Sequence, residues 1–388
     1  MSAGPAGTPS PEVPSPPVTG AWQEGDPRGD RRWVALDKPL GLEAGGELPG
    51  VRLAYETWGR LAPDASNAVL VLHALTGDSH VVGPAGPGHP TPGWWNGLIG
   101  PGLPLDTDRW FVVAPNVLGG CQGSTGPSSV RDGGARWGGA FPFLTQRDQV
   151  AAEAQFADAL GIERWALVIG GSMGGMRALE WAVTYPGRTG SLLLLACPAA
   201  ASAEQIAWAA VQLHAIRTDP HWRGGDYHGA RAGGGPHAGL GLARRLAHVT
   251  YRSEPELRAR FGRLTQGVED PWRGGRYRVE SYLDHHAAKL VRRFDAGSYV
   301  VLTEAMNSHD IGRDRGGTAA ALRRVRARTL VAGVDSDRLY PLAQQEELAA
   351  GIPGADRARI IESPYGHDGF LIETEQVAVL VRELLGSS

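Results

Sequence analysis

The sequence predicts an α/β protein in which a mostly parallel sheet is flanked by helices and carries an inserted helical lid. Short runs rich in leucine and β-branched residues recur at long intervals, with helical patterns between them. This alternation is typical of parallel strands joined by crossover helices. The strands expected from these runs are residues 69–73, 110–114, 165–170, 192–196, 329–334 and 359–362. An earlier alternating stretch, residues 52–58, predicts an antiparallel strand at one edge of the sheet.

The spacing of the strands breaks after Cys197 and resumes near residue 326. The intervening segment contains helix-like patterns, glycine-rich turns and one equivocal strand-like run at residues 299–303. We therefore expect a helical lid at residues 198–325, inserted into a catalytic core made of residues 30–197 and 326–388. Residues 1–29 are rich in Pro, Gly, Ser and Ala, so we expect them to form a disordered tail.

Composition excludes several classes of partner. The formal net charge is −3 and the pI is about 6.5, which gives no reason to expect a nucleic acid or an anionic membrane as a partner. The two cysteines, Cys121 and Cys197, have no zinc-binding spacing and cannot form a disulfide framework. No apolar run resembles a signal peptide or reaches the roughly 20 residues that span a bilayer. We expect a cytoplasmic protein without a metal or a membrane anchor.

One motif predicts the chemistry. The strand at residues 165–170 runs into Gly-Gly-Ser-Met-Gly-Gly, residues 170–175, and then into an apolar-periodic helix. A G-x-S-x-G turn between strand and helix is a nucleophile elbow, which holds its serine in strained geometry and needs glycines where side chains would collide. Ser172 is therefore the candidate nucleophile of an α/β-hydrolase fold, and the Met173 N–H is a candidate oxyanion donor. A glycine turn that only packs tightly or holds a phosphate is the alternative.

Chain order identifies the base. In this fold the acid and then the histidine follow the serine, each after a later strand. Of the 12 histidines, only His367 lies beyond the last two expected strands. His367 is therefore the candidate base, the alternative being a solvated loop histidine. His73 precedes the serine and breaks the order, so we expect a structural role for it.

The acid and the second oxyanion donor are expected on two other loops. Asp335 and Asp337 both follow the strand at residues 329–334, and their spacing does not choose between them. One of the two is expected to be only a turn or cap residue. The second oxyanion donor is expected after the strand at residues 69–73, where the N–H of Leu75 is the candidate.

An ordered set of motifs resembles one family across roughly residues 30–385. The motifs are HALTG at residues 73–77, PGWW at 92–95, NVLGGCQGSTGP at 116–127, GGSMGG at 170–175, SDRLYP at 336–341 and YGHDGF at 365–370. A lone G-x-S-x-G would indicate only a hydrolase fold, whereas this set resembles the homoserine O-acetyltransferases. That group also contains succinyl-transferring and serine-acylating relatives.

The resemblance implies residue roles. It makes Ser172 the nucleophile, Asp337 the acid and His367 the base. It also implies that Arg244 and Asp368 bind the amino-acid acceptor, which agrees with the guanidinium and carboxylate that a zwitterion needs. A homodimer built through the lid is implied as well.

The implied reaction is a ping-pong transfer from acetyl-CoA, a co-substrate, to L-homoserine through an acetyl-serine. It requires no metal or redox cofactor. The open alternatives are a succinyl-CoA or serine-acylating relative, an esterase or thioesterase with the same triad, and a binding protein with a vestigial site.

Overall fold

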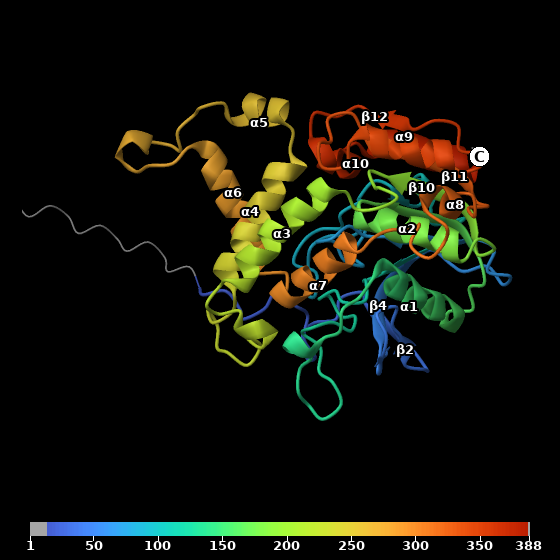
Figure 1. Ribbon diagram of the computed structural model, residues 1–388, viewed down its shortest axis with the longest axis horizontal. Coiled ribbons are helices and arrows are strands. Elements are labelled where there is room, and N and C mark those ends of the chain that lie inside the picture. The colour runs from blue at the N-terminus through green and yellow to red at the C-terminus, as the bar shows by residue number, and fades with distance from the viewer. Residues whose placement is uncertain (1–13, 387–388) are drawn as a thin grey trace, which may run out of the picture.

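The protein is built around an eight-stranded sheet, seen here in a computed structural model that describes residues 14–386 (Figure 1). The strand order is β1-β4-β8-β5-β9-β10-β11-β12. The strands are β1 (Arg32–Ala35), β4 (Arg52–Trp58), β5 (Ala68–Leu72), β8 (Phe111–Pro115), β9 (Trp165–Gly171), β10 (Thr189–Leu195), β11 (Arg328–Val334) and β12 (Arg359–Ile361). From β8 to β12 all neighbours are parallel, and β4 pairs antiparallel with both β1 and β8. The mostly parallel sheet expected from the sequence is confirmed.

Two strand expectations need correction. The strand Arg52–Trp58 is antiparallel as expected, but it is not the edge, because β1 pairs along its outer side. The four residues of β1 are too few to display an alternating pattern, so this strand was not predicted. The strand-like run at residues 299–303 lies inside the helix α7 (Ala296–Asn307). That helix is buried around most of its circumference, which removes the periodicity that distinguishes a helix from a buried strand.

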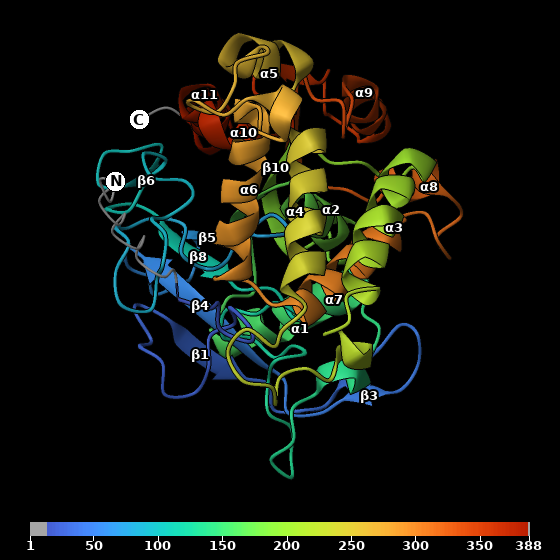
Figure 2. The same ribbon diagram turned by 90° about the vertical axis from the view of Figure 1, so that its left-hand side faces the viewer.

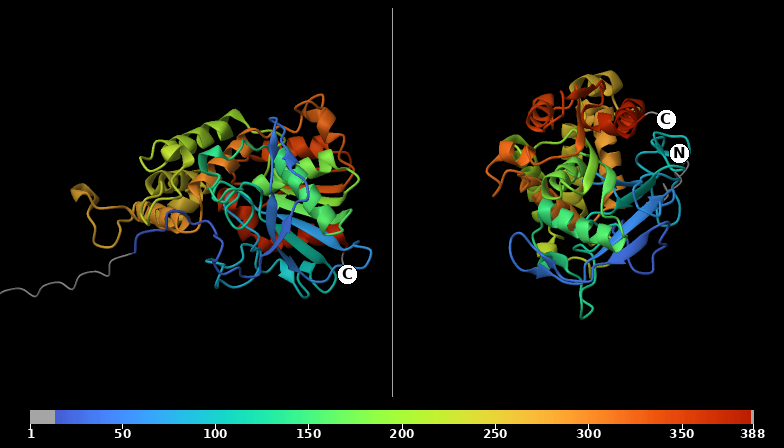
Figure 3. Two further views of the ribbon diagram at one scale, coloured as in Figure 1. Left: turned by 90° about the horizontal axis from the view of Figure 1, so that it is seen from below. Right: turned by 90° about the vertical axis from the view of Figure 1, so that its right-hand side faces the viewer.

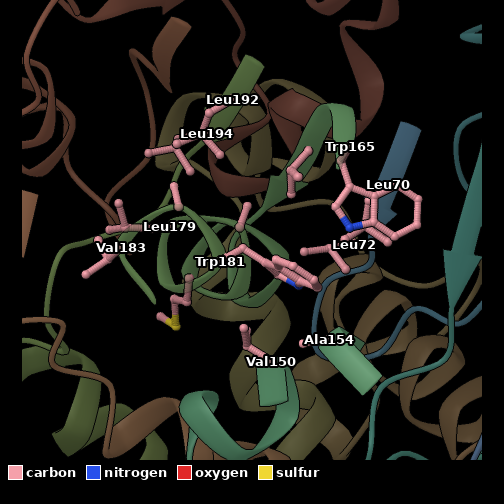
Figure 4. Packing of buried hydrophobic residues seen from close by; sticks show 14 of the residues in the cluster. Leu70, Leu72, Val150, Ala154, Trp165, Leu179, Trp181, Val183, Leu192 and Leu194 are labelled. Carbon is pink, nitrogen blue, oxygen red and sulfur yellow. The ribbon is translucent and has the colours of Figure 1, made fainter. Parts of the chain in front are cut away.

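Alternate residues of each central strand face two separate cores. On β10, Leu192 and Leu194 point into the layer formed by α1 (Gln146–Ala159) and α2 (Met173–Thr184), as Figure 4 shows. Leu193 and Leu195 point the other way, toward α11 (Thr374–Leu385). Both faces are covered, so the strands read as continuous apolar runs rather than alternating ones.

Outside the central sheet, α1, α2 and the lid helices, the described chain contains further helices and short elements. They are α8 (Thr318–Leu322), α9 (Leu342–Gly351), α10 (Gly369–Ile372), α11 (Thr374–Leu385), β2 (Leu40–Gly41), β3 (Glu47–Leu48), β6 (Ile99–Gly100), β7 (Leu105–Asp106), and the 3₁₀ turns η1 (Gly138–Ala140), η2 (Arg223–Gly225), η3 (Pro271–Arg273) and η4 (Gly366–Asp368). Side chains of α8 and α9 join the core of α1 and α2. Among the helices of the described chain, none is long and apolar enough to cross a membrane.

A buried ion pair connects α1 and α2 beneath the serine loop. The Arg177 guanidinium donates to Glu153 and, at 2.7 Å, to the carbonyl oxygen of His73. The Trp181 indole N–H donates to the other oxygen of Glu153 at 2.8 Å. Both charged side chains are at most 1% exposed. The pair therefore ties two core helices to the end of β5.

Replacing Glu153 with alanine should lower the free energy of unfolding by about 3–5 kcal/mol, because it leaves the Arg177 charge buried without its partner. Urea denaturation followed by circular dichroism measures this change. The exposed variant Glu163→Ala is the control and should change stability by less than about 0.5 kcal/mol. Equal stabilities of the two variants would contradict a structural role for the pair.

Five helices form a lid that projects beyond the sheet (Figures 1 and 2). They are α3 (Ala203–Arg217), α4 (His237–Tyr251), α5 (Glu254–Phe261), α6 (Arg278–Val291) and α7. Seen from below, α4 and α6 extend away from the catalytic domain (left view of Figure 3). The underside of the lid packs in one cluster with Leu75 and Met173, the two residues expected to provide oxyanion donors.

The expected disorder of residues 1–29 does not hold for the part that is described. The N–H of Gly20 donates to the carbonyl of Phe294, and the N–H of Trp22 donates to that of Cys121. The Trp22 ring also packs against Trp33 at 5.0 Å. The composition of this segment does not reveal its order, because the backbone partners Phe294 and Cys121 are remote in the chain. Residues 1–13 lie outside the described residues.

Candidate active site

Ser172 stands on a sharp turn between β9 and α2. Its backbone has φ 57° and ψ −125°, a region that non-glycine residues rarely adopt. A Cβ on Gly174 would lie 2.0 Å from the carbonyl oxygen of Leu72, and one on Gly170 would lie 2.3 Å from the backbone of Gly174. The collisions expected from the motif are therefore with strand β5 and with helix α2. The turn places Ser172 at the carboxyl end of the central strands.

Asp337 and His367 come from the loops after β11 and β12 and meet at the same edge of the sheet. His367 Nδ1 donates to Asp337 Oδ2 at 2.7 Å. The N–H groups of Leu339 and Tyr340 donate to Asp337 Oδ1 at 2.8 and 3.0 Å. Because Nδ1 carries this proton, Nε2 is the free acceptor of the ring. This is the arrangement that a general base requires.

Asp335 and His73, the alternatives to Asp337 and His367, have different surroundings. Asp335 is exposed, and its Oδ1 accepts from the N–H of Ser363 at 3.0 Å, so it joins two loops. Both ring nitrogens of His73 bond to the backbone, Nδ1 to Ala74 O and Nε2 to the N–H of Val117. Burial, followed by the charge of Arg177, lowers the pKa of His73 to about 3. Neither residue points at the serine.

A cavity of about 300 Å³ joins Ser172, His367 and Leu75. Met173 is the first residue of α2, so its N–H has no acceptor within the helix. The hydroxyl of Tyr340 is hydrogen bonded to the Ser172 side chain, and its ring lies 4.8 Å from that of His367. Tyr340 is therefore a further residue of the site. It belongs to the SDRLYP motif, but no role was predicted for it from the sequence.

The two residues expected to hold the acceptor line the same cavity. The Arg244 guanidinium donates to Thr76 Oγ1 at 3.3 Å and lies 5.7 Å from the Tyr251 ring. Asp368 Oδ2 lies 3.2 Å from a guanidinium nitrogen of Arg252. Burial raises the pKa of Asp368, although Arg252 opposes this. A cation and an anion thus face one cavity, as a zwitterionic acceptor requires.

Sequence reasoning missed Tyr251, Arg252 and His248, which also line the cavity. Together with Arg244 they lie near one face of α4 and at its end, three or four residues apart. A polar stripe with helical spacing next to Arg244 was the signal available in the sequence. This stripe can be recognised as part of the site only when the structure shows which face of α4 is turned toward the cavity.

One group elsewhere in the described chain has residue types that bind metals. Ligand atoms of Glu56, His80 and His89 lie within 4.8 Å of one another. The two imidazole rings stack with centroids 3.8 Å and planes 11° apart. Lone pairs of an imidazole lie in the ring plane, so nearly parallel rings cannot aim at one ion. His80 Nδ1 bonds Glu56 at 2.9 Å, and His89 Nε2 accepts from the N–H of Asp30. The group is a hydrogen-bonded core cluster.

The fold and the site define an α/β-hydrolase-fold protein, and the family model described as "alpha/beta hydrolase fold" matches residues 67–374. A homoserine O-acetyltransferase from Thermobifida fusca is 72% identical over 96% of this chain and 98% of its own length. The chain belongs to the homoserine O-acetyltransferase family.

Solved structures agree on the architecture. The crystal structure of a homoserine O-acetyltransferase from Bacillus anthracis has a TM-score of 0.82 and 27% identity, with 92% of this chain and 98% of that chain covered. The crystal structure of esterase E22 also has a TM-score of 0.82, with 25% identity and coverage of 92% and 99%. The same scaffold therefore occurs in proteins named for transfer and for hydrolysis.

Proposed function

We propose that this protein is a homoserine O-acetyltransferase that moves an acetyl group from acetyl-CoA to the hydroxyl of L-homoserine. The observation that carries the proposal is the cavity over Ser172, which presents both an arginine and an aspartate for a zwitterionic acceptor. An esterase of the same fold has no need for that pair. The 72% identity to the Thermobifida fusca enzyme supports the same substrate.

In the first half-reaction, Ser172 attacks the thioester carbonyl of acetyl-CoA. His367 Nε2 takes the serine proton, and Asp337 holds the ring through Nδ1. The N–H groups of Leu75 and Met173 stabilise the oxyanion until the C–S bond breaks. The proton on His367 passes to the departing thiolate. CoA leaves as the thiol, and an acetyl-serine remains.

In the second half-reaction, His367 removes the proton of the homoserine hydroxyl, which attacks the acetyl carbon. O-Acetylhomoserine leaves, and Ser172 regains its proton. Water is far more abundant than the acceptor, so transfer requires a site that excludes water and positions the hydroxyl. Ser172 is only 5% exposed and lies under the lid, which supports transfer over hydrolysis. None of these steps uses a metal or a redox cofactor.

Arg244→Lys should impair the second half-reaction and spare the first. Lysine keeps the charge but loses the planar, two-pronged geometry that binds a carboxylate. Losing one charge-assisted contact costs about 1.5–3 kcal/mol, which is roughly a tenfold to hundredfold fall in kcat/KM for homoserine. Rapid-mixing measurement of CoA release should show a normal burst. Loss of the burst with unchanged dependence on homoserine would assign Arg244 to the donor site.

Thiol release from acetyl-CoA and from succinyl-CoA, each with and without homoserine, tests the proposal against its alternatives. We expect steady release only with acetyl-CoA and homoserine together. Steady release without homoserine would make the protein a thioesterase, in keeping with the esterase neighbour. Faster release from succinyl-CoA would change the donor and leave the acceptor unchanged. Replacing homoserine by serine tests the serine-acylating alternative.

The proposed assembly is a homodimer in the cytoplasm, formed through the lid. Exposed apolar side chains support the interface: Ile206 and Val211 lie on α3, and Leu242 and Val249 lie on α4. Two free cysteines fit a reducing compartment. Light scattering after gel filtration should give twice the chain mass of 41.1 kDa. A charged substitution at Val211 should reduce that mass, and a wild-type monomer would contradict the assembly.

A further inference from the structure

The lid helix α4 carries a histidine that the proposed reaction leaves without a role. His248 lies one helical turn after Arg244 and lines the cavity that contains Ser172 and Asp368. The residue is only 3% exposed. Its Nδ1 bonds to the hydroxyl of Tyr282 on α6 at 3.0 Å. Its Nε2 is buried and has no hydrogen-bond partner among the described residues.

The surroundings of Tyr282 determine which nitrogen of His248 carries the proton. The Tyr282 hydroxyl is hydrogen bonded to the guanidinium of Arg252. A guanidinium only donates, so the hydroxyl accepts this bond, and its own proton remains available to donate to His248 Nδ1. When that proton is donated to Nδ1, the neutral imidazole carries its own proton on Nε2. His248, which lines the cavity, therefore carries a buried N–H donor that has no partner among the described residues.

The donor is uncharged at neutral pH. Burial is the largest effect that lowers the pKa of His248 far below its usual value, and the charges of Arg244 and Arg252 add to it. The neighbouring His286, whose ring lies 4.0 Å away, also has its pKa lowered by burial, to about 4. A neutral N–H between two guanidinium groups adds hydrogen-bonding capacity without adding a third repelling cation.

Buried N–H donors without partners are costly, and several residues that line the cavity carry one. Arg244 Nε is also buried and has no partner among the described residues. Leaving such a donor unpaired costs free energy in the empty site, and a ligand that accepts from both recovers it. Two donors one helical turn apart on α4, in a positive environment, match the two oxygens of a carboxylate better than a hydroxyl group.

We propose that His248 is a specificity residue that donates from Nε2 to the α-carboxylate of the amino-acid acceptor, which it binds together with Arg244. This inference rests on the proposed acyl transfer to homoserine. Tyr282 is a positioning residue that holds the imidazole in the donating tautomer, and Arg252 orients Tyr282 while it pairs with Asp368. The carboxylate and ammonium contacts of the acceptor thereby belong to one hydrogen-bonded network.

The test compares two acceptors in His248→Phe, which keeps the ring and loses the donor. We expect kcat/KM for homoserine to fall roughly tenfold to hundredfold, mainly through KM. For 3-aminopropan-1-ol, which is homoserine without its carboxylate, wild type and variant should differ by less than about threefold. The CoA burst with acetyl-CoA alone should be unchanged. His248→Gln, which retains an N–H at a similar reach, should recover most of the homoserine activity.

Two further variants separate binding from folding. Tyr282→Phe removes the partner of Nδ1 without entering the cavity and should raise KM for homoserine by several-fold even if His248→Phe does not fold. His285→Ala, an exposed neighbour on α6, should leave both acceptors unaffected. Equal losses with the two acceptors, or a slower CoA burst, would overturn the carboxylate assignment. A wild-type protein without any burst would instead overturn the proposed function.

Discussion

Ser172→Ala should reduce transfer of the acetyl group to homoserine by roughly a millionfold, to the background rate. The substitution removes the atom that forms the covalent intermediate, so neither half-reaction proceeds through the site. Thiol release from acetyl-CoA, with and without homoserine, measures the loss. The removed oxygen is small, and the strained backbone at φ 57° is no more accessible to alanine than to serine, so stability should change little.

Thermal unfolding of Ser172→Ala should therefore resemble that of the wild type. Ser66→Ala is the matched control, since Ser66 lies in an exposed turn far from the cavity in sequence and structure. It should retain full activity. Turnover by Ser172→Ala within about tenfold of the wild type would refute the triad.

Asp337→Asn should lower kcat by roughly ten-thousandfold. An amide can donate to His367 Nδ1, which favours the tautomer with the proton on Nε2 and leaves no acceptor for the serine proton. The same substitution in serine proteases, a worked case for this triad, gives a loss of that size. Leu339 and Tyr340 can still donate to the remaining oxygen, so the turn should keep its shape.

Asp335→Asn is the matched control because the two aspartates share one turn. Asparagine retains the oxygen that accepts from the N–H of Ser363. Activity should fall less than about threefold. If Asp335→Asn were the more damaging change, the acid would be Asp335 and the bond between Asp337 and His367 would be structural.

Local sequence was sufficient for the serine turn because its constraints are local. Gly170 and Gly174 are needed by atoms within the turn and the adjoining strand. Chain order was sufficient to select His367. The choice between Asp335 and Asp337 could not be made from local sequence. It depends on which of the two carboxylates the turn directs toward His367, which lies 30 residues after Asp337. Only the resemblance favoured Asp337 before the structure placed it.

What the sequence did not reveal depends on contacts between distant segments. The described part of the N-terminal segment is ordered by contacts with Phe294 and Cys121. The run inside α7 was ambiguous because a helix buried on nearly all sides has no polar face. The helical spacing from Arg244 to His248 was visible in the sequence, but the hydrogen bond from His248 to Tyr282, 34 residues away on another helix, was not. In each case the deciding partner is remote in the chain.

The central claim is that an acyl group is held on Ser172 and passed to homoserine. Mass spectrometry of the intact protein mixed with acetyl-CoA alone, followed by peptide mapping, tests it most directly. We expect one added acetyl group on the peptide that contains Ser172, and its loss with stoichiometric formation of O-acetylhomoserine once homoserine is added. Turnover without any acetyl adduct on Ser172, or an adduct that homoserine does not discharge, would contradict the account.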